Sequence, residues 1–265
     1  MPGRPGAERP WIAAPGECSA VGARLYTSRV PRPLPRAFYD RPTVTVARAL
    51  LGSVLCRRVA GLDLRGRIVE TEAYVGEEDL ACHARAGVTR RTEPLYGPPG
   101  MAYVYLTYGM HHLLNAVTER EGKPAAVLIR ALEPIDGVEW MEEARGVTAR
   151  HLIASGPGRL CQAFGLDLAW NRADLCEGEL WIEPGPAVAD RAVRTSPRIG
   201  CQNVPEPWAS IPWRFYVEGS PHVTPGRVGR NLVMTNARGF GNNPPSRAAA
   251  GPIRARRRNR STPSR

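Results

Sequence analysis

The chain has a single lysine, Lys123, although lysine and arginine together number 36 among its 265 residues. Enzymes that attack a carbon through a Schiff base need the amine of a lysine or of the chain terminus. Lys123 stands in a Gly-Lys-Pro turn, and the terminal amine would be that of Pro2 if Met1 is removed. Neither is a strong candidate, so the scarcity of lysine argues against an amine nucleophile.

The six cysteines form no CxxC pair, and no Cys/His cluster has the spacing of zinc ligands. Cys82 and His83 are neighbours, but two ligands do not make a metal site. We therefore interpret the cysteines as free thiols, which are typical of a reducing cytosol. No apolar run approaches the roughly 20 residues that a membrane-spanning helix needs. The composition thus predicts a cytoplasmic protein without a membrane partner.

The positive charge is concentrated at the two ends of the chain, whose formal net charge is +11. Residues 225–265 contain ten arginines and no acidic residue, and residues 1–36 contain six arginines against two glutamates. The middle of the chain is therefore slightly acidic. Basic segments attract phosphate groups, which favours a nucleic-acid partner. The alternative, that the arginines only keep the chain soluble, stays open.

The distribution of hydrophobic residues predicts one folded domain, residues 38–224. The flanking segments, residues 1–37 and 225–265, are rich in Pro, Gly and Arg and lack periodicity, so we expect disordered arms. Within the domain, the pattern predicts strands at 54–59, 64–75, 102–106, 113–118, 125–132, 180–183 and 213–218.

Three helices are predicted between these strands. One lies near 42–51, one follows a capping box of Asp136 and Glu139, and one opens at Ser155 and stops at Gly165. Strands outnumber helices, and their short spacings suit antiparallel pairing. The fold class that follows is α+β, a single mixed domain with a curved antiparallel β-sheet and flanking helices.

The strand predicted at 64–75 carries an unusual face. Side chains alternate along a strand, so Ile68, Glu70, Glu72 and Tyr74 are expected on one side. Two carboxylates and a tyrosine on one face are uncommon in a core strand. Either this face is simply solvated, or the carboxylates do chemistry.

A second segment, residues 102–110, is rich in tyrosine. Tyr103 and Tyr105 are expected on one face of a strand, and Tyr108 beside Gly109 on a turn tip. Aromatic rings stack on nucleic-acid bases with about 1–3 kcal/mol each, and exposed wedges can enter a base step. An enzyme that works on a base within a duplex must rotate that base out of the stack. Together with the basic ends, these segments indicate an enzyme that acts on an extruded base.

The chain resembles the alkyladenine (3-methyladenine) DNA glycosylases of the mammalian and bacterial type. The resemblance covers roughly residues 40–224, in order. It rests on RGRIVETEAY at 65–74, YVYLTYGM at 103–110, LIRALEP at 128–134, SGPGRLCQA at 155–163 and RFYVEGSP at 214–221. It implies a mixed α/β domain without metal or cofactor that removes 3-methyladenine, 7-methylguanine and, in some members, hypoxanthine and ethenoadenine.

The resemblance also implies residue roles in the reaction. Glu72 matches the glutamate that activates the attacking water. Arg130 matches an arginine that helps to hold this water and the DNA backbone. Tyr74, His83 and Tyr105 match the residues that sandwich or contact the flipped base.

Further matches concern selectivity and DNA insertion. Asn115 matches the pocket asparagine that opposes the amino group of normal guanine. Tyr108 matches the wedge that fills the vacated gap, and Met110 on the same turn is expected to insert with it. The chain departs from vertebrate members at His111, where they carry an aromatic residue, so its lesion scope can differ. Glu70 has no catalytic counterpart, and we expect a structural role for it.

The combined prediction is a monofunctional enzyme, a monomer that acts on double-stranded DNA containing damaged purines and leaves an abasic site. Two other classes stay open on the residues alone. A metal-dependent nuclease would use Glu70, Glu72 and Asp79 as ligands. A non-catalytic module would bind damaged nucleic acid and release no base.

Overall fold

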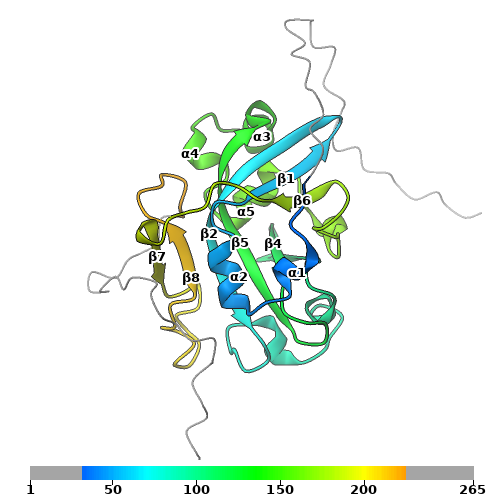
Figure 1. Cartoon of the computed structure of the whole chain (residues 1–265), viewed down its shortest axis with the longest axis vertical. Helices are drawn as coiled ribbons and strands as arrows, with labels where there is room; N and C mark the ends of the chain where they lie inside the picture. Colours follow the sequence, from blue (N-terminus) through cyan, green and yellow to red (C-terminus); the bar gives the residue numbers. More distant parts are fainter. Residues whose placement is uncertain (1–31, 225–265) are drawn as a thin grey trace, which may run out of the picture. The chain divides into compact units, whose positions relative to one another are not determined.

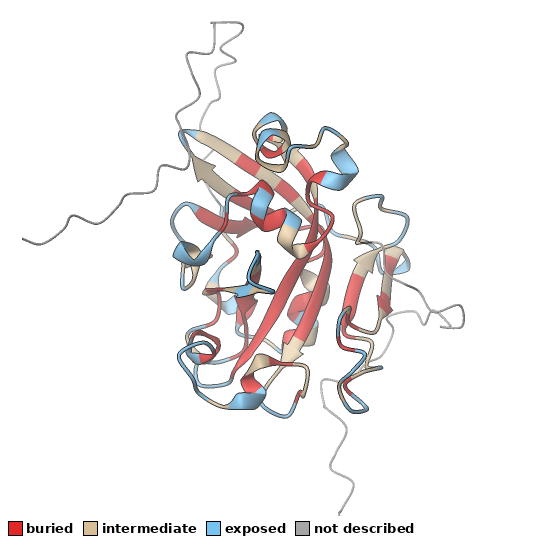
Figure 2. Ribbon diagram, turned by 180° about the vertical axis from the view of Figure 1, so that it is seen from behind, coloured by how far each residue is buried: buried red, intermediate tan, exposed pale blue. Residues whose placement is uncertain are grey.

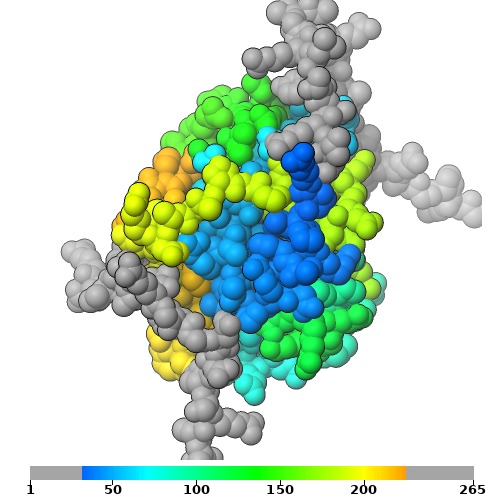
Figure 3. Space-filling view, viewed as in Figure 1, coloured from blue at the N-terminus to red at the C-terminus, as the bar shows by residue number. Residues whose placement is uncertain are grey.

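The fold described here is that of a computed structural model, which describes residues 32–224 (Figures 1 and 3). Most of the two predicted arms lies outside these residues. Residues 32–37 are described, and they belong to the domain, because Leu34 is buried and its N–H donates to the carbonyl of Ile182 at 2.7 Å. Helix α1, Arg36–Tyr39, begins directly afterwards.

The described residues form an eight-stranded antiparallel sheet with the order β3-β4-β5-β2-β1-β6. Strand β8 pairs with β2 and with β7. The strands are β1 Val54–Val59, β2 Leu62–Val75, β3 Ala102–Thr107, β4 His111–Val117, β5 Ala125–Asp136, β6 Leu180–Glu183, β7 Val193–Ser196 and β8 Arg214–Val217. The prediction of a single mixed α+β domain around an antiparallel sheet is confirmed.

Short helices cover the sheet. The α-helices after α1 are α2 Thr43–Ala49, α3 Val138–Arg145, α4 Arg150–Ile153 and α5 Pro157–Ala163. The 3-10 helices are η1 His83–Ala86, η2 Glu93–Tyr96, η3 Leu168–Trp170 and η4 Asp190–Ala192. Helices α2, α3 and α5 were predicted, whereas α1, α4, β7 and the 3-10 helices were not, because three or four residues show no periodicity.

The capping box predicted before α3 is wrong. Asp136 is the last residue of β5, and its carboxylate accepts a hydrogen bond from Arg65 at 2.8 Å. The residue that caps α3 is Gly137, with φ of 70° and without a side-chain hydrogen bond. A side chain is excluded there, since a Cβ on Gly137 would lie 2.5 Å from Leu64 Cδ2. The strand thus turns into the helix through a left-handed glycine.

The strict alternation predicted for β2 is also wrong in its first half. Register shifts interrupt the pairing with β5 between Ile68 and Glu70 and again between Glu70 and Thr71. A β-bulge inserts an extra residue and reverses the side-chain pattern beyond it. Ile68 therefore belongs to the main hydrophobic core together with Ala73, while Glu70 and Glu72 bind arginine on the other side.

The main core lies between the sheet and the helices packed on it. Val46 and Ala47 of α2, and Leu160 and Phe164 around α5, are fully buried in this core. Figure 2 shows the two long central strands, β2 and β5, buried along most of their length. Since β2 is anchored in this way, its second half offers a rigid support for a site.

Candidate active site

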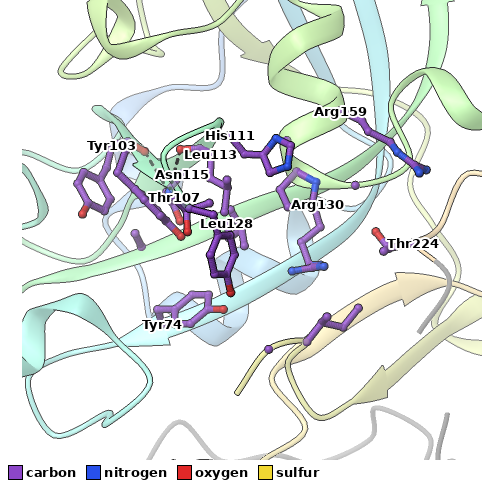
Figure 4. Close-up of a pocket in the computed structure, with 18 of the residues that line it drawn as sticks. Tyr74, Tyr103, Thr107, His111, Leu113, Asn115, Leu128, Arg130, Arg159 and Thr224 are labelled. Atoms are coloured by element: carbon purple, nitrogen blue, oxygen red, sulfur yellow. Dashed lines mark hydrogen bonds between the residues drawn. The ribbon is translucent and has the colours of Figure 1, made fainter. Parts of the chain in front are cut away.

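A cavity of about 930 Å³ opens beside the second half of β2. It is lined from β2, β3, β4 and β5, by the start of α5, and by the segment after β7 (Figure 4). Six of the eight predicted site residues line it: Tyr74, His83, Tyr105, Tyr108, Asn115 and Arg130. Glu72 and Met110 are not lining residues. Glu72 lies directly behind the wall, bonded to Tyr74 and Arg130.

Glu72 is fully buried and is held by three donors. Its Oε2 accepts hydrogen bonds from the Tyr74 hydroxyl at 2.8 Å and from Arg130 Nη1 at 3.1 Å. Its Oε1 accepts from the backbone N–H of Ile199 at 2.7 Å. A carboxylate offers about four acceptor positions, and these three donors leave one of them unused.

Arg130 supplies the charge that a buried carboxylate needs. Burial by itself would lower the pKa of Arg130, but the carboxylates of Glu72 and Glu70 outweigh burial and raise it. The guanidinium therefore stays charged and bridges the two acids, with Nε donating to Glu70 at 3.0 Å and Nη1 to Glu72. Its positive charge offsets part of the cost of burying the two acidic side chains.

Both carboxylate oxygens of Glu70 are engaged, by Arg214 and Thr224 as well as by Arg130. Oε1 accepts from Arg214 Nε at 2.7 Å, and Oε2 accepts from the N–H of Thr224 at 2.7 Å. Arg214 in turn donates to the carbonyl of Thr224 at 3.2 Å. This network connects β2, β8 and the end of the described chain, which accords with the structural role expected for Glu70.

An aromatic wall faces the cavity from β3 and η1. The His83 and Tyr105 rings meet edge to face with centroids 4.6 Å apart, and Tyr103 and Tyr105 lie 5.3 Å apart. His83 Nδ1 lies 3.0 Å from the Tyr103 hydroxyl, so Nε2 is the ring nitrogen left for a ligand. Burial, with the nearby charges of Arg91 and Arg85, lowers the pKa of His83 to about 4. His83 is consequently neutral at pH 7.

Asn115 reaches the cavity from β4, opposite Tyr103 of β3. Its amide nitrogen donates to the Tyr103 carbonyl at 3.0 Å. This bond fixes the plane of the amide in a buried position. Asn115 therefore presents a rigid polar group to any ring that enters the cavity.

The β3–β4 turn carries the residues predicted to insert into DNA. Tyr108 is 88% exposed and has a positive φ of 50°, and Met110 is 70% exposed. Figure 2 shows the tip of this hairpin as exposed. The base of the turn packs closely against α5. His111 lies so near Gly158 that a Cβ on this glycine would be only 3.1 Å from His111 Cγ. An exposed aromatic ring on a supported turn is suited to insertion.

Two arginines give the cavity a basic side. Arg145 and Arg159 line it and bind neutral oxygen atoms: Arg145 Nε donates to the Ile153 carbonyl at 2.9 Å and Arg159 to Ser155 Oγ at 3.1 Å. Burial and the charge of Arg159 lower the pKa of Arg145. Figure 4 shows Arg159 near the cavity on the side of α5. This side can attract phosphate.

Sequence reasoning missed several groups of the site. The Ile199 amide holds Glu72 in place, and the Tyr103 hydroxyl holds His83. Cys201 also lines the cavity, with Sγ 3.9 Å from the Tyr74 hydroxyl. A backbone amide has no sequence signal, and residues 199–201 approach β2 only through the fold.

The three acids of the alternative nuclease site do not form a ligand set. Each is already bound by arginine: Glu70 and Glu72 by Arg130, and Asp79 by Arg198. Within residues 32–224, no group of three or more His, Cys, Asp or Glu side chains is arranged to hold a metal ion. In the same residues, none of the helices has the length and apolarity needed to cross a membrane.

Comparison with known proteins places the chain in a family. Residues 37–221 match the family model described as methylpurine-DNA glycosylase. The chain belongs to the methylpurine-DNA glycosylase family. It is therefore a DNA glycosylase, and its substrate is DNA. The matched segment nearly coincides with the described residues.

Individual relatives of the family agree with this assignment. The chain is 54% identical to a protein of Methanocella arvoryzae over 193 residues. This alignment covers 72% of this chain and 95% of the relative. It is 50% identical to one of Myxococcus xanthus (73% and 94%) and 44% identical to one of Chlorobaculum parvum (72% and 90%). Each of these is named "putative 3-methyladenine DNA glycosylase".

Proposed function

We propose that the chain is a monofunctional repair glycosylase that flips alkylated purines out of duplex DNA and hydrolyses their N-glycosidic bond. The observation that carries the proposal is the position of Glu72, buried behind the cavity wall and held by Tyr74, Arg130 and the Ile199 amide. A carboxylate held in this way can polarise a water molecule toward the sugar of a nucleotide in the cavity.

The reaction needs few protein groups. Glu72 takes a proton from the water while the water oxygen bonds to C1′ and the bond from C1′ to the purine nitrogen breaks. The electron pair of that bond leaves with the base, and an abasic site remains. The Glu72 carboxylate also stabilises the positive charge that develops on the sugar, because the charge forms in a buried site. General-base assistance contributes roughly 10²–10⁴-fold.

The aromatic wall supports binding of a flipped purine. Tyr105 and His83 offer ring surfaces on one side of the cavity, and Tyr74 offers another. Stacking offsets the few kcal/mol that extrusion of a base costs. Asn115, held by its bond to Tyr103, opposes the amino group of normal guanine and so disfavours undamaged DNA.

The groups present favour cationic lesions. A methylated purine such as 3-methyladenine or 7-methylguanine carries a positive charge and leaves without protonation. Hypoxanthine and ethenoadenine are neutral and need a proton on the base. His83 does not supply one near pH 7, since its pKa is about 4. We therefore expect faster excision of the methylpurines than of hypoxanthine under single-turnover conditions.

The scarcity of amines supports hydrolysis without strand cleavage. Lys123 forms an ion pair with Glu119 and does not line the cavity. No Schiff base is expected, so borohydride should trap no covalent enzyme–DNA adduct. A trapped adduct would overturn the monofunctional assignment.

The deciding experiment compares Glu72→Gln with the intact chain on duplexes that contain one lesion. Free base released in a single turnover and lesion affinity are measured together. Glu72→Gln is expected to bind the lesion and to lose base release. Glu93→Gln, on an exposed ion pair with Arg172, is the matched control and should keep the parental rate. Base release at the parental rate by Glu72→Gln would show that another group is the base.

The same experiment addresses the non-catalytic alternative. A binding module would hold lesion-containing DNA and release no free base even from the intact chain. Release from the intact chain on 3-methyladenine, 7-methylguanine, hypoxanthine and ethenoadenine substrates would establish both the activity and its lesion range.

A further inference from the structure

An ion pair without a part in the mechanism above joins Arg198, just after β7, to Asp79, just after β2. Both side chains are 0% exposed. The contact is forked, with Nη1–Oδ2 at 2.5 Å and Nη2–Oδ1 at 2.8 Å. Asp79 also accepts from the backbone N–H of Val75 at 3.1 Å and of Ala81 at 3.0 Å. Asp79 and Arg198 do not line the cavity themselves, but Ala81 and Ile199, close to them in the chain, do.

Stability alone does not explain a pair of this kind. Removal of two charges from water costs about as much as their attraction returns, so a buried ion pair adds little net stability. Arg198 nevertheless stays charged, because the bond to Asp79 outweighs burial and raises its pKa. The pair therefore contributes mainly through the groups that it holds in place.

Arg198 does not contact Glu72 itself, but it is next to two of the groups that donate to Glu72. Its neighbour in the chain, Ile199, donates its backbone N–H to Glu72 Oε1 at 2.7 Å. Its guanidinium also lies 4.7 Å from the centre of the Tyr74 ring, whose hydroxyl donates to Glu72 Oε2. In addition, Arg198 Nη1 donates to the carbonyl of Ala73, the residue between Glu72 and Tyr74, at 2.9 Å.

We propose that Arg198 and Asp79 are a positioning pair that holds the Ile199 amide and the Tyr74 ring against Glu72. The pair touches no substrate. It ties the segment after β7 to the segment after β2, so that two of the three donors to Glu72 keep their direction. The proposal rests on the proposed function, in which Glu72 is the base.

The test is a double-mutant cycle in the full chain. Asp79→Asn removes the charge with little change of shape, and Arg198→Lys keeps the charge but cannot form the fork. Each is expected to lower single-turnover release of 7-methylguanine by on the order of 10²-fold, since a small misplacement of a catalytic group has this effect. Lesion affinity should fall by much less than the rate, because Tyr74 is only one of the rings that line the cavity.

The cycle separates positioning from general damage to the fold. If the pair acts through Glu72, Asp79→Asn in the Glu72→Gln background should lower the residual rate by no more than about twofold. A full additional loss in that background, or an unchanged rate in the single variants, would overturn the proposal. The control is Glu183→Gln, which breaks the largely buried pair with Arg65 away from the cavity and should leave the rate unchanged.

A second measurement does not depend on the variants of Arg198 being folded. The Ile199 amide proton is observed by NMR in the intact chain and in Glu72→Gln and Asp79→Asn. A bond to a carboxylate shifts this proton downfield, so both substitutions should move it upfield. An unmoved resonance in Asp79→Asn would contradict the proposal. Absence of base release from methylated DNA by the intact chain would instead contradict the proposed function.

Discussion

The Tyr74 hydroxyl lies 2.8 Å from Glu72 Oε2, and the ring of the same tyrosine is part of the cavity wall. The two residues are separated by Ala73 on β2, so the bond is set by the pleat of one strand. Burial and the charge of Glu72 raise the pKa of Tyr74 well above its ordinary value. The phenol therefore remains a donor and couples the shape of the cavity to the direction of the carboxylate.

Tyr74→Phe isolates this bond, because it removes the hydroxyl and keeps the ring. A hydrogen bond to a charged group contributes about 1.5–3 kcal/mol, which corresponds to a rate loss on the order of 10-fold or more. We expect single-turnover base release to fall by that amount, with lesion affinity retained. Equal losses of rate and affinity would mean that the hydroxyl serves binding rather than orientation of Glu72.

Tyr108→Ala tests the wedge. Tyr108 is 88% exposed, so its loss should not change the melting temperature. Stacking contributes about 1–3 kcal/mol per ring, and affinity for a lesion in duplex DNA should fall by roughly 5-fold to 150-fold. The matched control is Val88→Ala, at a side chain that is 67% exposed and outside the cavity lining. An equal loss of affinity for the same lesion in a single strand would contradict a wedge, since a single strand has no gap to fill.

Where the hydrophobic pattern was long or strongly apolar, the bounds of the strands could be predicted from the sequence to within a few residues. The bounds of β1 and β6 agree with the prediction, and β2 and β5 differ from it by a few residues. The exceptions have physical causes. A bulge near Glu70 reversed the expected face of Ile68, and Gly137 replaced the expected cap of α3.

The candidate site was only partly visible in the sequence. The pattern alone indicated a face with Glu70, Glu72 and Tyr74 but did not distinguish the two acids. In the fold they differ because Glu70 also binds Arg214 of β8, which does not line the cavity, whereas all three donors to Glu72 are lining residues. Contacts across more than 100 residues leave no local signal, and the resemblance to a family supplied the choice of Glu72.

His83 should make the stability of the domain depend on pH. Burial lowers its folded-state pKa from 6.5 to about 4, so between these values the unfolded chain binds more protons than the folded one. This contribution to the free energy of unfolding is complete above about pH 6.5 and is lost as the pH falls toward 4.

The check compares urea unfolding of the intact chain and of His83→Gln at pH 5 and pH 7. His83→Gln should lose less stability on acidification than the intact chain does. The difference is expected because glutamine does not titrate. His151→Gln serves as the control, since the His151 side chain is exposed in the folded chain. An identical change for His83→Gln and the intact chain would show that His83 is not buried as a neutral ring.

The arginines at 254, 256, 257 and 258 allow the role of the basic end to be tested without shortening the chain. They belong to residues 225–265, outside the described domain, and Thr224, the last described residue, lines the cavity. Each phosphate contact releases counterions and contributes about 0.9 to the slope of log affinity against log salt. Replacement of all four by glutamine should therefore lower the slope for undamaged duplex DNA by up to roughly 3–4. Single-turnover base release at saturating DNA should not change, because Glu72 and its donors are untouched. An unchanged salt slope together with reduced solubility would favour the simpler interpretation, in which these arginines only keep the chain in solution.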